Sequence, residues 1–230
     1  MSLSILCVSK AEPFALPFLS SMVHLGEAVD ADVVFAADGW PAYQILKDLR
    51  STKVIKVESR GYVESVLNTA LEHCDGDYIL RLDDDEKASP SMVEWLKNRE
   101  FESEPHWKFP RAHLWRDTSM FIAAAPLWPD HQTRLSVQSM AGGRTTVHAG
   151  SPFGGGEEAL VVLEHHKFLV KSTQERRTIA ERYDRVHPGY GTGGMLAFNL
   201  PEQVWPNEGD IRLRPIGYAD WCVTMKEPAV

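Results

Sequence analysis

The chain has 230 residues, with 24 Lys and Arg against 32 Asp and Glu, and a formal net charge of -8 at pH 7. This acidic balance argues against sequence-independent nucleic-acid binding, because such binding uses clustered basic side chains to neutralise phosphates. Hydrophobic residues make up 43% of the chain and charged residues 24%, which is ordinary for a folded globular protein and excludes a disordered or fibrous chain. The length suits a single continuous domain.

Targeting signals and a disulfide framework are not evident in the sequence. The three cysteines, Cys7, Cys74 and Cys222, are too few and too scattered for a disulfide scaffold, so we expect reduced structural thiols. No apolar run approaches the roughly 20 residues that cross a bilayer, and the N-terminus lacks a basic segment followed by an apolar core. We therefore expect a cytoplasmic protein without a transmembrane segment. The sequence does not indicate its oligomeric state.

The first 100 residues alternate between strand-like and helix-like segments. Short apolar runs predict strands at residues 3–8, 32–37, 53–57 and 77–82. Amphipathic spacing and helix-start signals predict helices at residues 41–49, 63–71 and 89–96, and a first helix that begins late because of Pro13 and Pro17. Parallel strands need crossover connections of this length, so the pattern predicts a mostly parallel sheet with helices on both faces.

An acidic run follows the fourth predicted strand at residues 83–86. Side chains alternate along a strand, so Asp83 and Asp85 are expected to point the same way and Asp84 the opposite way. Two carboxylates in one small volume favour a hard divalent cation such as Mg²⁺ or Mn²⁺ between them. The alternative is a solvated acidic turn. Glu86 has no assigned role.

Four segments follow the carboxyl ends of the predicted strands, which is where ligands collect in such sheets. They are Ser9-Lys10, Asp38-Gly39, Arg60-Gly61 and the acidic run. Their convergence predicts a binding site on one edge of the sheet.

The second half of the chain has a more antiparallel character. Short β-like runs cover residues 107–115, 119–125 and 134–138, and a further apolar strand is expected at 159–163, before His165 and His166. Each of these histidines is interpreted either as a metal ligand or as a structural residue. The glycine-rich residues 149–158 form a lid over substrate or a plain surface loop. A helix is expected at 173–186, and we assign no chemistry to the chain beyond it.

These motifs resemble the family 2 glycosyltransferases, which have the GT-A fold. Residues 76–85 are similar to the strand that leads into the DxD motif of that family, and Asp38-Gly39 resembles its acidic second-strand end. Gly61 with residues 68–71 is similar to the glycine and the Asn-containing helix before that motif. Further on, residues 128–135, the pair Val147-His148 and the pair His165-His166 resemble later segments of short bacterial members.

The resemblance implies a fold, a reaction and roles for particular residues. The fold is a GT-A-like, Rossmann-related α/β domain with a smaller mixed or antiparallel acceptor region, in which residues 1–100 bind the nucleotide sugar and residues 101–230 bind the acceptor. The donor is a nucleotide-diphosphate sugar, with a UDP-sugar favoured over a GDP-sugar. The resemblance implies that Asp38 contacts the nucleotide base and that Asp83 contacts the ribose or sugar. Asp85, with His165 or His166, would bind the Mn²⁺ or Mg²⁺ on the diphosphate. Further contacts with the donor are implied for Ser9, Arg60 and Asp84.

The family also implies inversion at the anomeric carbon, with a carboxylate as the base that deprotonates the acceptor. The usual Glu-Asp pair is not evident here, so Asp130 is the first candidate, with Glu157 and Glu158 behind it. The sequence also has Leu67 where many members have Arg. The acceptor is open among a glycan, a small metabolite, a protein and a modified nucleic acid.

Other functions are compatible with an acidic site on such a sheet. A sugar-nucleotide nucleotidyltransferase usually has a glycine-rich first loop, which residues 9–12 lack. A haloacid-dehalogenase-like phosphatase carries its Asp-x-Asp pair on the first strand rather than the fourth. A non-catalytic nucleotide- or sugar-binding protein is the alternative outside enzymes.

Overall fold

The first part of the chain alternates strands and helices as the sequence predicts. This computed structural model describes residues 1–141 and 156–225. In chain order, the elements before the acidic run are β1 (Leu3–Ser9), α1 (Leu16–Val29), β2 (Asp32–Asp38), α2 (Trp40–Leu46), β3 (Lys53–Val57), α3 (Glu64–Leu71) and β4 (Tyr78–Arg81). Residues 149–155 of the predicted lid and the pair Val147-His148 lie outside the described residues.

The later elements are shorter and more varied. They are β5 (Glu86–Ala88), α4 (Pro90–Lys97), η1 (Glu100–Ser103), β6 (His106–His113), β7 (Met120–Ile122), β8 (Asp130–Val137), α5 (Gln138–Ala141), β9 (Glu157–Glu158), β10 (Leu163–His165), α6 (Lys167–Val170), α7 (Thr173–Val186), η2 (Tyr190–Gly194), α8 (Leu196–Asn199), α9 (Pro201–Val204), η3 (Glu208–Asp210), β11 (Leu213–Pro215) and α10 (Ile216–Met225). No helix of the described ranges is long and apolar enough to cross a membrane.

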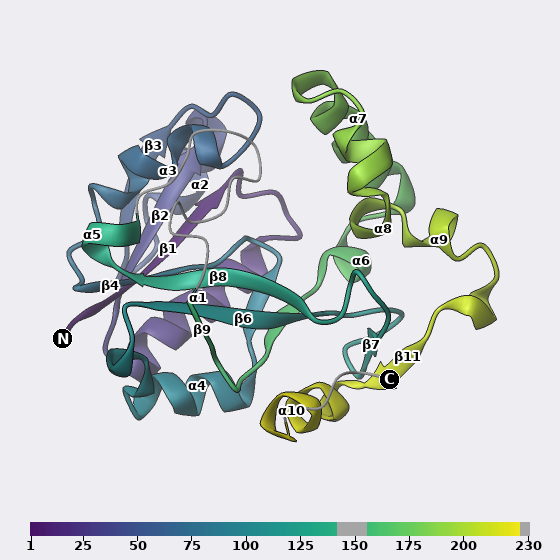
Figure 1. Cartoon of the computed structure of the whole chain (residues 1–230). Helices are drawn as coiled ribbons and strands as arrows, with labels where there is room; N and C mark the ends of the chain where they lie inside the picture. The colour runs from purple at the N-terminus through teal and green to yellow at the C-terminus, as the bar shows by residue number, and fades with distance from the viewer. Residues whose placement is uncertain (142–155, 226–230) are drawn as a thin grey trace.

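The main sheet joins both halves of the chain in one layer (Figure 1). Its strand order is β3-β2-β1-β4-β8-β6-β10-β5, with β9 paired to β6. The four strands of the first half are mutually parallel, whereas β8 is antiparallel to both β4 and β6. A small antiparallel sheet pairs β7 with β11. The predicted α/β fold, a mostly parallel sheet with a mixed second half, is therefore confirmed.

Alternate residues of β1 enter two different apolar clusters, because successive side chains point to opposite faces of a strand. Ile5 and Cys7 pack in one cluster with residues of α1, α2 and α4. Leu6 and Val8 pack in the other cluster with residues of α3. Helices therefore cover both faces of the parallel half, as the sequence predicts.

Two local expectations are wrong. Most of the predicted strand at residues 159–163 is irregular chain between the two-residue β9 and the three-residue β10, and only Leu163 belongs to β10, because a buried apolar run does not by itself specify a strand. In addition, β4 ends at Arg81, and the acidic run lies in a turn in which the Glu86 N–H donates to the Asp83 carbonyl at 3.0 Å. Strand alternation therefore does not set the directions of Asp83 and Asp85.

Candidate active site

The acidic turn lies between the two halves of the sheet. The Leu82 N–H donates to the Leu6 carbonyl of β1 at 2.9 Å, which holds the start of the turn beside the first strand. After the turn, β5 pairs antiparallel with β10, and Glu86 stands opposite His165 in that register. The segment that ends at His165 therefore meets the acidic turn directly, as the predicted site requires.

Two buried arginines neutralise one side of the turn. Arg134 of β8 contacts both Asp83 and Glu86, and Arg111 of β6 contacts Glu86 at 3.0 Å. Glu86 is fully buried. Burial would raise the pKa of Asp83, but the positive charges of Arg134 and Arg81 lower it to about 2. Asp83 and Glu86 are thus held as charged partners of residues from distant strands.

Asp85 has a different pair of neighbours. Its carboxylate forms an ion pair with Lys171, and its Oδ1 lies 3.3 Å from Nε2 of His165. Burial opposes ionisation, but the positive charge of Lys171 holds the pKa of Asp85 well below its usual range. Asp85 is therefore an ionised carboxylate with an imidazole nitrogen beside it.

Asp84 faces the end of β1. Ser9 donates a hydrogen bond from its hydroxyl to Asp84 at 2.7 Å. Burial and the neighbouring charge of Asp85 raise the pKa of Asp84 to about 7. The structure thus brings Ser9 and the acidic turn together, and the contact connects β1 to the loop after β4.

Asp130, the first candidate for the base, is 8% exposed and already has several donors. Its Oδ2 accepts a hydrogen bond from Arg111 at 2.8 Å and lies 2.9 Å from Nε2 of His113, while its Oδ1 accepts from Gln132 at 2.7 Å. Burial opposes ionisation, but His113 and Arg111 hold the pKa of Asp130 well below its usual range. A carboxylate so placed is a poor proton acceptor, so the geometry does not favour Asp130 as the catalytic base, and that role stays a prediction.

Glu157 and Glu158 are also poorly placed for catalysis at the acidic turn. Glu157 pairs with Trp107 near the start of β6, whereas His165 pairs with His113 at its end. Six residues of strand separate these positions, or about 20 Å at the usual rise. Glu157 therefore lies far from the acidic turn, and a catalytic role for it stays a prediction.

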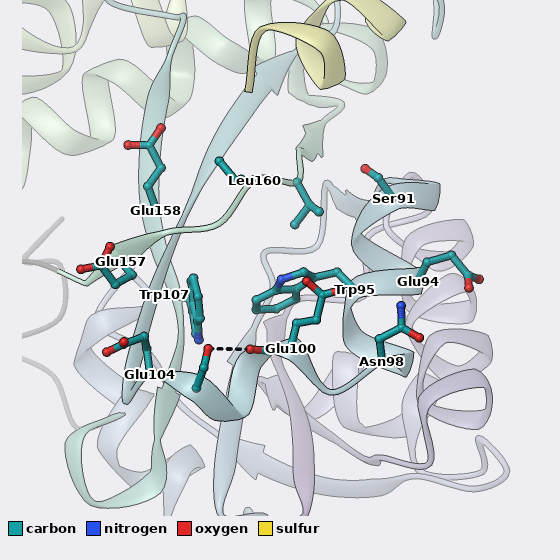
Figure 2. A pocket seen from close by; sticks show the side chains of 12 residues that line it. Ser91, Glu94, Trp95, Asn98, Glu100, Glu104, Trp107, Glu157, Glu158 and Leu160 are labelled. Atoms are coloured by element: carbon teal, nitrogen blue, oxygen red, sulfur yellow. Dashed lines mark hydrogen bonds between the residues drawn. The ribbon is translucent and has the colours of Figure 1, made fainter. Parts of the chain in front are cut away.

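Both glutamates line a pocket of about 600 Å³ on another part of the molecule. Figure 2 shows them on the opposite side of this pocket from Ser91 and Glu94 of α4, with Trp95 and Trp107 between. This pocket is separate from the acidic turn.

Asp38 and Arg60 lie at the ends of their strands without contacting the acidic turn. Asp38 accepts hydrogen bonds from the Ser59 N–H at 2.8 Å and the Ser59 hydroxyl at 2.6 Å, so its carboxylate shapes the loop after β3. Arg60 is exposed, and its backbone N–H donates to the Ser65 hydroxyl at 2.9 Å. A nucleotide contact by either residue stays a prediction.

The two adjacent histidines have different environments. His165 lies beside Asp85, whereas the His166 ring lies 3.2 Å from a Glu164 carboxylate oxygen and packs edge-on against Phe18. His166 contributes a backbone hydrogen bond from its N–H to the Asp85 carbonyl at 2.8 Å. The geometry therefore selects His165 rather than His166 as the side chain facing Asp85.

Sequence reasoning did not identify four charged or polar neighbours of the turn: Arg111, His113, Arg134 and Lys171. One signal was available for two of them. Arg111 and His113 are alternate residues of a segment expected to be β-like, so they share one face of β6. Only the pairing of β6 with β8 and β10 shows that this face meets the acidic turn.

The donor set at the turn fits a hard divalent cation with few protein ligands. Within the described ranges, no group of three or more His, Cys, Asp or Glu is arranged to hold a metal. Asp85 and His165 nevertheless supply one carboxylate oxygen and one imidazole nitrogen at a single point. Mg²⁺ sites commonly use one or two carboxylates and complete the shell with water and substrate phosphates. Lys171 contacts the same carboxylate and would share it with the cation.

Residues 5–101 match the family model described as "Glycosyl transferase family 2". This segment is therefore similar to the family 2 glycosyltransferases. It contains β1 to β4, the acidic turn and α4, so the family match covers the part of the chain in which the predicted motifs lie. The match indicates an enzyme of the glycosyltransferase type. Comparison with curated proteins gave no match.

Solved structures with a similar fold include two bacterial proteins. The chain superposes on residues 1–349 of TarS from S. aureus with a TM-score of 0.50 at 13% identity, over 83% of this chain and 68% of that one. It superposes on Rv0371c from Mycobacterium tuberculosis H37Rv with a TM-score of 0.50 at 12% identity, over 71% and 90% of the two chains. At these identities the likeness shows the fold alone.

Proposed function

We propose that this chain is a metal-dependent, inverting glycosyltransferase that moves a sugar from a nucleotide-diphosphate donor to an acceptor hydroxyl. The observation that carries the proposal is the meeting of Asp85 and His165, 3.3 Å apart, at the acidic turn of the segment that matches family 2. The UDP-GlcNAc complex of TarS and the manganese complex of Rv0371c support a UDP-sugar donor and a divalent cation.

In this proposal, residues 1–100 bind the donor and residues 101–230 bind the acceptor. Asp38 and Arg60 lie at the nucleotide end, and Ser9, Asp83 and Asp84 shape the floor of the donor site. A divalent cation held by Asp85 and His165 would stabilise the negative charge that develops on the departing diphosphate. The acceptor remains open among the classes named above.

The charged side chains around the turn would hold the site rigid during the reaction. In an inverting transfer the acceptor hydroxyl gives its proton to a general base, and its oxygen bonds to the anomeric carbon as the bond to the diphosphate oxygen breaks. Arg111 and Arg134 fix Glu86 in the interior and therefore fix the turn that carries Asp85. Lys171 lies beside Asp85, where its ammonium adds positive charge near the leaving diphosphate.

Thermal melts test this proposal directly. UDP, GDP and dTDP are added with and without Mn²⁺, and one nucleotide is expected to stabilise the protein only when Mn²⁺ is present. A ligand at 100 times its dissociation constant adds roughly 2.7 kcal/mol of stability. If Mn²⁺ changes the effect of none of the three nucleotides, the proposed donor chemistry is wrong.

Two matched variants locate the effect. Asp85→Asn removes the carboxylate beside His165 and is expected to abolish the Mn²⁺-dependent shift. Asp75→Asn is the control, because Asp75 also pairs with a lysine, Lys53 at 3.4 Å, but is exposed and remote from the turn. Circular dichroism checks that both variants fold. An equal loss of the shift in both variants would contradict the assigned site.

A further inference from the structure

A line of hydrogen-bonding side chains leads away from Asp85 into the interior. His165 faces Asp85 with Nε2, and its Nδ1 lies 2.8 Å from Nδ1 of His113. The two rings are nearly perpendicular, with centroids 4.6 Å apart. Nε2 of His113 lies 2.9 Å from Oδ2 of Asp130. The line therefore runs through two imidazoles and ends at a carboxylate.

The carboxylate at the inner end determines which nitrogen of His113 carries a proton. Asp130 accepts hydrogen bonds from Arg111 and Gln132, as an ionised carboxylate does, and it can offer only lone pairs to His113. The proton therefore sits on Nε2 of His113. Arg111 already neutralises Asp130, and His113 is fully buried, so the neutral imidazole is favoured.

A neutral His113 with its proton on Nε2 has a bare Nδ1 that can only accept. At 2.8 Å from that atom, Nδ1 of His165 must be the donor. The second nitrogen of His165, Nε2, then has a lone pair directed at the Asp85 carboxylate 3.3 Å away. Two acceptors in contact repel each other unless a cation lies beside both. The arrangement is therefore that of a metal ligand whose other ring nitrogen is fixed by its neighbours.

We propose that Asp130 and His113 are positioning residues that hold His165 in the tautomer with a bare Nε2, so that His165 and Asp85 together bind a divalent cation. This inference rests on the proposed function for the identity of the site. It gives Asp130 a role that its buried hydrogen bonds allow, in place of the base expected from the sequence. It also explains why the fully buried His113 lies between Asp130 and His165.

The tautomer can be measured without metal, nucleotide or activity. Long-range ¹H–¹⁵N spectra of metal-free protein labelled with ¹⁵N-histidine distinguish protonated from bare ring nitrogens. The wild type is expected to show His165 with a proton on Nδ1 and a bare Nε2. A proton on Nε2, or on both nitrogens, would overturn the inference even if Mn²⁺ and UDP stabilise the protein.

Variants of His113 test the positioning role. His113→Phe removes the acceptor for His165 Nδ1, and we expect loss of the single tautomer and a roughly 10–100-fold weaker affinity for Mn²⁺ alone, measured from the electron paramagnetic resonance signal of free Mn²⁺. His113→Asn places an amide oxygen near the position of Nδ1 and is expected to restore much of the affinity. This second variant keeps the test informative if the Phe variant does not fold.

His131→Phe is the matched control. His131 lies next to Asp130 on β8, but its ring faces Glu158 at 2.7 Å rather than His165. The His131→Phe variant should bind Mn²⁺ with the same affinity as the wild type. Unchanged affinity in His113→Phe would refute the positioning role. A wild type with the expected tautomer but no affinity for Mn²⁺ would instead refute the metal dependence of the proposed function.

Discussion

Removal of the Glu86 carboxylate is expected to destabilise the fold strongly. Glu86 is fully buried, contacts Arg111 at 3.0 Å and Arg134 at 2.6 Å, and accepts a hydrogen bond from the Asp83 N–H at 2.9 Å. Glu86→Ala would leave two buried guanidinium groups each with one carboxylate fewer. Breaking a buried ion pair by removing one partner costs about 3–5 kcal/mol.

The expected loss is large enough to measure in two ways. For 230 residues the unfolding entropy near the midpoint is about 0.5 kcal/mol/K, so a loss of about 4 kcal/mol lowers Tm by about 8 °C. Urea unfolding should give a lower free energy of unfolding with little change in the m-value. Both measurements are made on metal-free protein, so the outcome does not depend on the proposed activity.

Glu94→Ala provides the matched control. Glu94 pairs with Lys97 at 2.8 Å, a distance similar to that in the buried pairs, but its side chain is 65% exposed. Exposed pairs of this kind contribute about 0.3–0.5 kcal/mol. If Glu86→Ala costs less than about 1 kcal/mol, or no more than Glu94→Ala, the view that the buried arginines depend on Glu86 is wrong.

Two further predictions concern close packing and buried thiols. A Cβ at Gly191 would lie 1.9 Å from the Ala180 carbonyl oxygen, whereas a Cβ at Gly193 would meet nothing within 4 Å. Gly191→Ala should therefore lower the free energy of unfolding, measured in urea, by about 1–3 kcal/mol or more, and Gly193→Ala should lower it much less. Burial raises the pKa of Cys74 to about 12, so its contribution to stability is complete below the unfolded pKa near 9 and is lost as the pH rises from there toward 12. The wild type should therefore lose more stability than Cys74→Ala between about pH 8 and pH 11 in urea unfolding at each pH, and an equal loss in both would contradict this assignment.

The strands and helices of the first half could be predicted because their signals are local. Each of β1 to β4 is a short apolar run, and α4 has Ser89 as a cap that accepts a hydrogen bond from the Met92 N–H at 3.2 Å. Likewise, the helix expected at 173–186 is α7, which begins with reciprocal hydrogen bonds between Ser172 and Glu175. Local chemistry of this kind is visible in a few consecutive residues.

The directions of the acidic side chains could not be predicted in the same way. The alternation argument assumes that the strand continues through Asp85, but β4 ends at Arg81 and the chain turns. The turn is fixed by contacts with Ser9, Arg134 and Lys171, which come from three distant parts of the chain. Such contacts depend on strand register, which the sequence of the acidic run does not contain.

The charges at the turn link these structural details to the proposed cation. Arg134 and Lys171 contact Asp83 and Asp85, respectively, whereas Asp84 accepts a hydrogen bond from the uncharged hydroxyl of Ser9. Burial and the charge of Asp85 raise the pKa of Asp84 to about 7, so Asp84 is only partly ionised near neutral pH. A divalent cation beside Asp85 would favour the ionised form of Asp84. The arginines that hold Glu86 fix the turn that carries Asp85, and the bare nitrogen of His165 would supply a second ligand for the cation at the same point.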